Sequence, residues 1–359
     1  MSGPRGPGTR VMNRSYDRTI NPEIQNRLRE YLSREEILEL HRRSGWRHFA
    51  LVLQQVVLLV GVGILSYRIS TPWIWIPLAL FQGFVILGFI ILLHEQVHNL
   101  IFARRRPIRE RILGLFYSLP SAISASQFKR WHLDHHSELG TADDDPKRAY
   151  LSPKRVSRWY KALYMTPALF VIYSIGAAKA ARSYPASLRR TIQLERLVFV
   201  AIHLAFATWM VSHAGWAVWA RVHAVPVFLA FPFAFTLNRL GQHYAIDPRD
   251  PAKWSTLVKS HWFWNWIFVY SNFHLEHHYL IGVPAYNLPR MQAKLWPFYE
   301  AIGHRPMGFG EILYHWFVRN RTPHTNWTED EGPDPAGGPG PGVHPVRASS
   351  SSALPGSAP

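Results

Sequence analysis

The sequence predicts an all-α, polytopic membrane protein with about four transmembrane helices, further helices at the membrane interface and a histidine-rich metal-binding cap in the cytosol. The membrane part is predicted by four long apolar segments in a basic chain of 359 residues, of which 48% are hydrophobic and whose formal net charge is +17. The cap is predicted by three short histidine clusters, which lie at or between the ends of these segments.

The two ends of the chain have the composition of disordered segments. Residues 1–20 are polar, basic and rich in Gly and Pro, and residues 323–359 are rich in Pro, Gly and Ser. Residues 21–322 are therefore expected to form one folded domain. It should begin with a helix that has Asn21 as N-cap and Pro22 at the first helical position. Ser33 and Glu36 then have the spacing of a capping box.

Two pairs of apolar segments predict the membrane spans. Residues 49–67 and 72–93 form the first pair, and His94 follows directly. Residues 197–210 and 216–237 form the second pair, with a hairpin turn near Gly215. Each approaches the roughly 20 apolar residues that a helix needs to cross a bilayer. The third segment is short, so its helix is expected to begin earlier, with Glu195 and Arg196 close to the interface.

Two shorter apolar stretches predict helices in the membrane interface. Residues 163–178 contain Pro167 and are followed by Lys179 and Arg182. Residues 112–125 predict an interfacial or re-entrant helix that Pro120 breaks.

Counting the spans places all three histidine clusters on one side of the membrane. If the basic N-terminus is cytosolic, each pair of spans returns the chain to the cytosol, so the clusters and both termini are cytosolic. The excess of basic residues in the proposed cytosolic regions agrees with the positive-inside rule. These residues are Arg104, Arg105, Arg106, Arg109, Arg111, Lys154, Arg155, Arg189 and Arg190.

The spacing of the clustered histidines predicts a site for two metal ions. His94 and His98 are spaced i, i+4, and two trios follow with the spacing i, i+3, i+4. The trios are His132, His135 and His136, and His274, His277 and His278. On a helix, each cluster points its imidazoles to one side. Neutral imidazole binds iron, zinc and copper, and eight ligands are too many for one tetrahedral zinc.

The remaining histidines are better explained by the amphipathic character that places aromatic rings at membrane interfaces. They include His48, His203, His213, His223, His261, His304 and His315.

Composition excludes other classes of site. The chain has no cysteine, so disulfides, thiolate metal sites, iron–sulfur clusters and cysteine nucleophiles are excluded. A basic chain can bind nucleic acid or an anionic membrane. Because the arginines flank apolar segments, the sequence favours the membrane and no nucleic acid. No cleavable signal peptide is expected, since the N-terminus lacks an apolar core.

The clusters resemble the three histidine boxes of the membrane fatty acid desaturase superfamily. The segment Asn272-Phe-His-Leu-Glu-His-His278, continued by Gly282-Val-Pro284 and Tyr286-Asn-Leu-Pro289, is similar to the third box. The second box is followed by Gly140-Thr and Asp143-Asp-Asp-Pro146, as in the family. The resemblance covers about residues 47–295. It implies a non-haem diiron centre that uses O2 to attack an unactivated C–H bond, with the eight box histidines as metal ligands and catalytic residues.

The resemblance also implies a ninth ligand. The family often places an extra histidine between the second and third boxes, and His243 matches it because it follows the fourth span. The alternative is an ordinary interfacial histidine.

Several polar residues in or beside the boxes are expected to orient an imidazole N–H or to serve as caps and surface contacts. Those expected off the ligand face are Glu95, Asp134 and Glu276, and Asn99 and Asn272 could act likewise. One of Asp143, Asp144 and Asp145 is expected to have a structural role.

The leading hypothesis is an O2-dependent desaturase that introduces a double bond into a fatty acyl chain of a lipid or thioester. A hydroxylase or ketolase of the same superfamily is the alternative, acting on a carotenoid, sphingolipid or small metabolite. Sequence spacing does not separate the two. A membrane protein that only binds or transports metal is disfavoured, because transporters place ionisable groups near the bilayer midplane.

Electrons are expected from a separate protein of the ferredoxin or cytochrome b5 type, since the His-Pro-Gly-Gly signature of a fused cytochrome b5 is absent. The arginines from Arg104 to Arg111 could dock such an acidic donor or contact lipid phosphates. Short loops favour a bacterial inner membrane. Substrate, regioselectivity and oligomeric state stay open.

Overall fold

The structure is a computed structural model that describes residues 22–139, 145–244, 246 and 250–321. The described residues form helices and no strand, apart from one isolated bridge between Val258 and Met307. The predicted all-α class is confirmed. Residues 1–20 and 323–359, Asn21, Asp143 and Asp144 lie outside the described residues, so the expectations on them are not addressed.

Two short helices precede the membrane part. They are α1 (Pro22–Leu28) and α2 (Arg34–Leu40). The predicted capping box begins α2: the Glu36 N–H donates to Ser33 Oγ at 3.2 Å, and the Ser33 N–H donates to Glu36 Oε2 at 2.8 Å. Both residues satisfy backbone groups that a helix start leaves without partners.

Four helical segments are long and apolar enough to cross a membrane, as predicted. They are α3 (Gly45–Arg68), α4 (Pro72–Val97), α10 (Ala186–Ala214) and the continuous segment Trp216–His243. The third helix starts well before residue 197, as expected, and Glu195 lies in its first half. Gly215, with a φ of 84°, turns the chain between the last two spans. This backbone conformation favours glycine.

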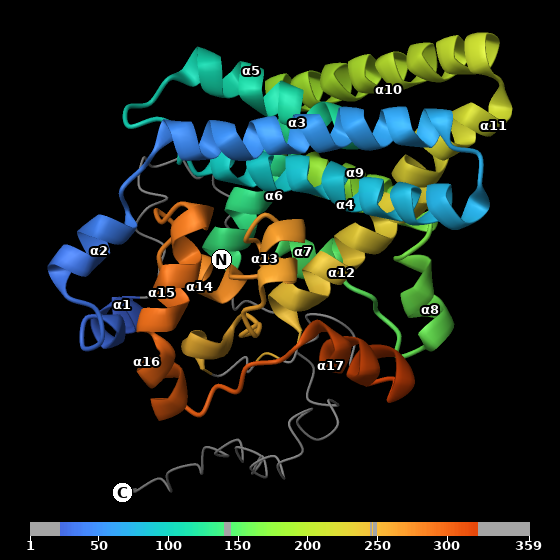
Figure 1. The fold of residues 1–359 in the computed structure, drawn as a ribbon. Helices are drawn as coiled ribbons and strands as arrows, with labels where there is room; N and C mark the ends of the chain where they lie inside the picture. The colour runs from blue at the N-terminus through green and yellow to red at the C-terminus, as the bar shows by residue number, and fades with distance from the viewer. Residues whose placement is uncertain (1–21, 140–144, 245, 247–249, 322–359) are drawn as a thin grey trace, which may run out of the picture.

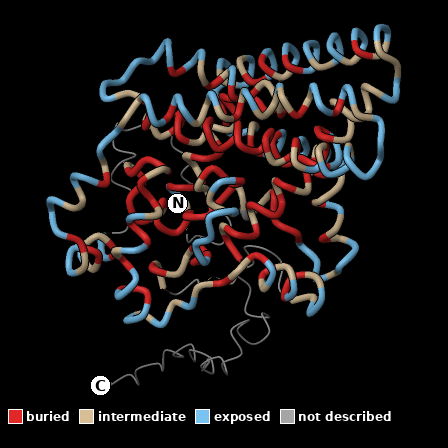
Figure 2. Tube along the Cα trace, viewed as in Figure 1, coloured by how far each residue is buried: buried red, intermediate tan, exposed pale blue. Residues whose placement is uncertain are grey.

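The outer spans present apolar surface to their surroundings. In Figure 2, which has the view of Figure 1, the tube along α3 and α10 is exposed or intermediate over most of its length. Leu53 on α3 and Leu197 on α10 are 63% and 67% exposed. Apolar side chains that are exposed along the length of a helix are typical of a surface in contact with the membrane. Helix α4 differs, because 67% of the residues in its most apolar 18-residue stretch are buried inside the protein.

Helix α4 is the central span and fixes the position of His94. It packs against α3, α5 (Pro107–Ser118), η5 (Pro226–Ala230) and α12 (Phe231–His243) (Figure 1). At the crossing with η5, a Cβ atom on Gly83 would overlap the backbone of Ala230. Glycine therefore permits the close approach that aligns the two inner spans.

The fourth span is irregular. It consists of α11 (Trp216–Trp219), two π-helical turns, η4 (Ala220–Ala224) and η5 (Pro226–Ala230), and α12 (Phe231–His243). Pro226 and Pro232 lack the N–H that an α-helix needs, and wider turns accommodate such interruptions. The helix continues past the expected end at residue 237, so His243 is its last residue.

The two stretches expected at the interface form shorter helices with shifted ends. Helix α5 (Pro107–Ser118) ends before Pro120, which lies in the 3-10 turn η2 (Leu119–Ser121). Helix α9 (Ala168–Ala180) has 13 residues and begins after Pro167. It is too short to cross a bilayer.

The remaining helices form a cap beside the spans, below α3 and α4 in Figure 1. Those between the spans are α6 (Ala125–Glu138), α7 (Pro146–Leu151), α8 (Arg158–Leu163) and the 3-10 turn η3 (Ala181–Ser183). Those after the spans are η6 (Pro251–Lys253), α13 (Trp262–Ile267), α14 (His274–Tyr279), η7 (Ala285–Asn287), α15 (Leu288–Lys294), α16 (Trp296–Ala301), α17 (Phe309–Leu313) and η8 (Tyr314–Val318).

Candidate metal centre

Nine histidines converge in two groups at the junction of the spans and the cap. We call them cluster 1 and cluster 2. Cluster 1 contains His94, His98, His132, His136 and His277, and cluster 2 contains His135, His243, His274 and His278. Within each cluster the nearest ring nitrogens all lie within 4.8 Å of one another. All eight box histidines and His243 are therefore brought together.

The boxes are distributed between the clusters in a pattern that refines the sequence prediction. In each trio, the i and i+4 histidines enter one cluster and the i+3 histidine enters the other. On an α-helix the i and i+4 side chains are about 40° apart, whereas i+3 and i+4 are about 100° apart. A trio on α6 or α14 thus points to two neighbouring sites and not to one.

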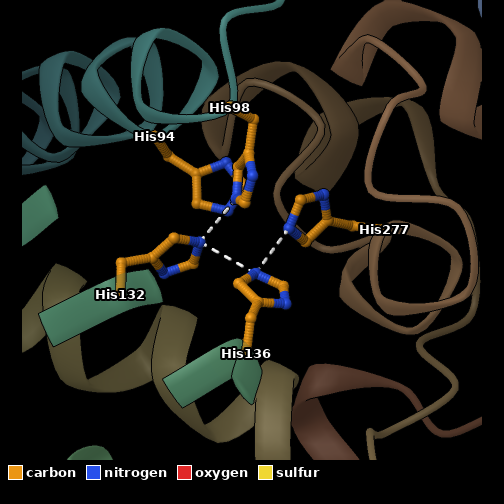
Figure 3. A group of neighbouring side chains, drawn as sticks. All are labelled: His94, His98, His132, His136 and His277. Atoms are coloured by element: carbon orange, nitrogen blue, oxygen red, sulfur yellow. Dashed lines mark hydrogen bonds between the residues drawn. The ribbon is translucent and has the colours of Figure 1, made fainter. Parts of the chain in front are cut away.

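Cluster 1 is a chain of close Nε2 atoms (Figure 3). His98 and His132 are 2.7 Å apart, His132 and His136 are 2.9 Å apart, and His136 and His277 are 3.1 Å apart. His98 is the C-cap residue of α4. The helix ends there because Asn99 adopts a left-handed conformation with φ of 58°.

Cluster 2 is built in the same way from α6, α12 and α14. His274 Nε2 lies 3.1 Å from His243 Nε2 and 3.0 Å from His278 Nε2. His243 is oriented by its other ring nitrogen, Nδ1, which lies 3.2 Å from the Trp254 carbonyl oxygen. A carbonyl accepts only from N–H, so this contact leaves the Nε2 lone pair directed at the cluster.

The arrangement fits metal ions. An imidazole nitrogen bonds a metal at about 2.1 Å, so ligands at right angles lie about 3 Å apart. The observed Nε2 separations of 2.7–3.1 Å match this spacing. In addition, His94 Nε2 and His135 Nε2 are buried without a hydrogen-bond partner among the described residues. Buried lone pairs that converge without a donor are costly unless a cation binds among them.

Burial keeps these imidazoles in the neutral, metal-binding form. It holds the pKa values of His132, His135 and His136 well below the ordinary value of 6.5, and neighbouring charged groups lower them further. Burial likewise lowers the pKa values of His274, His277 and His278 in the third box well below 6.5.

Asp145 is the aspartate that contacts a box histidine. His135 Nδ1 lies 2.9 Å from Asp145 Oδ2, and both side chains are buried. The other carboxylate oxygen accepts from the Lys147 backbone N–H at 2.9 Å. Because the carboxylate accepts the Nδ1 proton, the lone pair of His135 is placed on Nε2, within cluster 2.

The other polar residues in or beside the boxes form hydrogen bonds or ion pairs with residues other than the clustered histidines. Glu95 Oε2 accepts from the Ala285 N–H at 3.1 Å, and Asp134 pairs with Arg130 at 2.9 Å. Glu276 Oε1 accepts from Gln292 Nε2 at 2.9 Å and from the Tyr299 hydroxyl at 2.7 Å. Asn272 Nδ2 donates to Asn265 Oδ1 at 2.8 Å.

Sequence reasoning missed the anchor of the second box. Glu195 on α10 accepts from Ser124 Oγ at 2.6 Å and from the Ser126 N–H at 2.9 Å, at the start of α6. Arg111 adds an ion pair at 2.7 Å. The sequence does contain a lone glutamate in an apolar helix and a Ser-x-Ser pair before the second box. It gives no indication that the glutamate and the serines are in contact.

Two cavities reach the clusters. One, of only about 20 Å³, adjoins His94, His274 and His277 and is lined by polar Glu95 and Gln242 among others. The other, of about 230 Å³, adjoins His136 and His278. Each cavity therefore touches members of both clusters.

Four spanning helices and two adjoining histidine clusters define an integral membrane protein with a paired site that could hold metal ions. The family model described as fatty acid desaturase matches residues 70–310, and the chain belongs to this family. It is accordingly an oxidoreductase, and the predicted resemblance is confirmed.

The relatives include enzymes of two lipid classes. The chain is 26% identical over 307 residues to the human sphingolipid delta(4)-desaturase/C4-monooxygenase DES2, covering 83% of this chain and 88% of that protein. It is 26% identical over 274 residues to the Drosophila melanogaster sphingolipid delta(4)-desaturase DES1, covering 76% and 80%. It is 25% identical over 293 residues to the sn-1 oleoyl-lipid 12-desaturase of Anabaena variabilis, covering 75% and 81%.

Proposed function

We propose that the protein is an O2-dependent, non-haem diiron desaturase that introduces a double bond into a fatty acyl chain carried by a lipid or thioester. The observation that carries this proposal is the convergence of nine neutral histidines in two adjoining clusters within a desaturase-family membrane protein. All nine serve as metal ligands, His243 among them, in one catalytic domain over residues 21–322.

Each protein group has a defined task in this proposal. The histidines would hold two iron ions, and the chemistry that such ions supply when bound is the reductive activation of O2 for attack on an unactivated C–H bond. Iron suits this donor set because imidazole is a good iron ligand, whereas magnesium and calcium prefer oxygen. Asp145 fixes the tautomer of His135, and burial of the clusters keeps water from the oxidant.

The reaction requires an external electron donor. Removing two hydrogen atoms from adjacent carbons while reducing O2 to two waters consumes two further electrons and two protons. We propose that a ferredoxin or cytochrome b5 type protein supplies the electrons. The basic loop from Arg104 to Arg106, whose side chains are exposed, favours an acidic partner of this kind.

The proposed topology places the clusters and both termini in the cytosol. His94 in the last turn of α4 and His243 at the end of α12 belong to adjoining clusters, as an even number of spans requires. The basic segments between the spans favour the cytosolic side. A bacterial inner membrane is the proposed location.

The decisive experiment is lipid product analysis by mass spectrometry in cells that express the protein, combined with metal analysis of the purified chain. We expect an unsaturated product and about two irons per chain for the wild type. His136→Ala in cluster 1 and His243→Ala in cluster 2 should each lose metal and reduce product to background, because each removes an Nε2 donor from its cluster.

His48→Ala is the matched control. His48 is also a buried histidine, but it bonds the Tyr117 hydroxyl at 2.9 Å and belongs to neither cluster. This variant should retain iron and product. Full iron content and turnover in His136→Ala would refute the diiron proposal, and the same result in His243→Ala would remove the ninth ligand.

A hydroxylase is the second candidate. The human relative's name carries both a desaturase and a C4-monooxygenase activity on sphingolipids. Hydroxylation uses the same O2, electrons and protons but places one oxygen atom on carbon. A product that gains oxygen, with acyl unsaturation unchanged, would favour this function, whether the substrate is a sphingolipid, a carotenoid or a small metabolite.

A further inference from the structure

A small cavity lies where α7, α12 and η8 meet. Its volume is about 10 Å³, which is close to the roughly 10–15 Å³ that one water molecule needs. Leu151 at the end of α7, Arg239 on α12 and Trp316 on η8 are among the residues that line it. None of the lining residues belongs to either histidine cluster. The cavity is therefore separate from the candidate metal centre and admits one small ion or molecule.

Arg239 brings a positive charge to this cavity. Its Nη2 is buried and has no hydrogen-bond partner among the described residues. The guanidinium lies 6.0 Å from the centre of the Phe235 ring, which attracts the charge but leaves the N–H groups without an acceptor. Asp145 is the carboxylate whose charge acts on Arg239, and it is bonded to His135 Nδ1. Arg239 therefore supplies a charged donor that requires an acceptor.

Trp316 supplies a second donor to the same cavity. Its side chain is 0% exposed, and Nε1 is buried without a hydrogen-bond partner among the described residues. The indole N–H can donate but cannot accept. Lys161 adds positive charge on this side, since its Nζ lies 5.7 Å from the centre of the Trp316 ring and donates to the Trp316 carbonyl at 2.9 Å.

Tyr173 on α9 places a third donor near Arg239. Its hydroxyl is also buried without a partner among the described residues, and its ring packs against the same hydrophobic core as Trp316. Burial raises the pKa of this hydroxyl, while Arg239 is one of the charged groups that lower it. The guanidinium and the hydroxyl are therefore within electrostatic range of each other. The raised pKa keeps the hydroxyl protonated, so it can donate.

We infer that this cavity binds a monatomic anion of the halide class, held by Arg239 Nη2 and Trp316 Nε1 with the Tyr173 hydroxyl nearby. Buried N–H groups are costly unless an acceptor bonds them. An anion is favoured over water as that acceptor, because Arg239 and Lys161 surround the cavity with positive charge and hydrogen bonds to charged groups are the stronger ones. Polyatomic anions such as phosphate exceed the volume. The site needs neither the metal ions nor the reaction of the proposed function.

The first test is thermal unfolding of the purified full-length protein in detergent, with sodium chloride replacing sodium gluconate at constant ionic strength. The wild-type unfolding temperature should rise with chloride concentration, because an ion that binds only the folded state stabilises it. Arg239→Gln removes the charged donor and should weaken the apparent chloride affinity by roughly tenfold or more. An equal rise in this variant would indicate a general salt effect or binding elsewhere and would overturn the inference.

A second variant tests the other donor. Trp316→Phe keeps an aromatic ring but removes the N–H, so it should also weaken the apparent chloride affinity. The comparison of chloride with gluconate is made within each variant, so a lower overall stability from the smaller ring does not affect it. Chloride dependence equal to that of the wild type in Trp316→Phe would overturn the inference.

Two matched controls lie outside the cavity. Trp264 packs against the same hydrophobic core but does not line the cavity, so Trp264→Phe should keep the chloride dependence of the wild type. Arg221 lies in the same span as Arg239, and its Nε donates to the Ser66 carbonyl at 3.1 Å. Arg221→Gln should keep the chloride dependence as well. Its loss in either control would overturn the inference.

Bromide locates the ion directly. In crystals of the full-length protein grown with sodium bromide, anomalous scattering should show a bromide ion within hydrogen-bond distance of Arg239 Nη2 and Trp316 Nε1. Bromide found only at other positions would overturn the inference. So would a wild-type unfolding temperature that does not respond to chloride, or one that responds to acetate and not to chloride, since the latter would indicate a carboxylate ligand.

Discussion

At the scale of single residues, the Asp145 carboxylate is expected to affect metal binding most directly, because it orients a clustered histidine. It holds His135 Nδ1 at 2.9 Å and is buried with it. We predict that Asp145→Asn lowers iron affinity or turnover roughly 10–100-fold, because loss of a carboxylate that orients a ligating histidine has effects of this size. Iron content after dialysis and lipid product yield measure the effect.

Asp134→Asn provides the matched comparison. Asp134 lies in the same box but pairs with Arg130 at 2.9 Å instead of with a histidine. Its substitution should leave iron affinity unchanged. Equal iron affinity together with equal product yield in the two variants would contradict the orienting role of Asp145.

At the scale of elements, the placement of α6 depends on α10. Glu195 is buried and accepts from Ser124 Oγ, the Ser126 N–H and Ser126 Oγ, the last at 2.7 Å. We predict that Glu195→Ala destabilises the protein by roughly 2–3 kcal/mol, because it leaves buried donors unsatisfied. The measurement is thermal unfolding of the metal-free protein in detergent.

The exposed ion pair of Glu39 and Arg290 provides a comparison for the loss of stability expected in Glu195→Ala. Its atoms are 2.9 Å apart, but both side chains are 53% exposed. Glu39→Ala should therefore change stability by no more than about 1 kcal/mol. A Glu195→Ala variant as stable as Glu39→Ala would show that α6 is held by other contacts.

The elements that sequence predicts well are those whose signal is local. The spans, the capping box at Ser33 and the histidine spacing all depend on residues a few positions apart. The distribution of each trio between two clusters was not predicted. Helix geometry separates the directions of the i+3 and i+4 side chains, but which other histidines each side chain meets depends on where α14 meets α6. The contacts of His243 with Trp254 and of Glu195 with α6 were missed for the same reason. They join segments whose proximity only the fold creates.

At the scale of the whole molecule, the clusters join four segments that are distant in sequence. Cluster 1 takes histidines from α6, α14 and the end of α4, and cluster 2 takes them from α6, α12 and α14. Metal bound in either cluster would therefore cross-link spans and cap. Because a ligand that binds only the folded state stabilises it, chelation should lower the unfolding temperature and readdition of iron should restore it.

The metal-free protein should also become less stable as the pH falls. In the folded state, burial holds the pKa values of the six histidines in the second and third boxes well below 6.5. In the unfolded chain the same histidines titrate at about 6.5. Below that pH the unfolded chain binds protons that the folded protein does not, so the equilibrium moves towards unfolding. Unfolding temperatures of the chelated protein should decrease steadily from about pH 7.5 to about pH 5.5. A flat profile would mean that the metal-free clusters open and admit water, because only solvated imidazoles would keep their ordinary pKa.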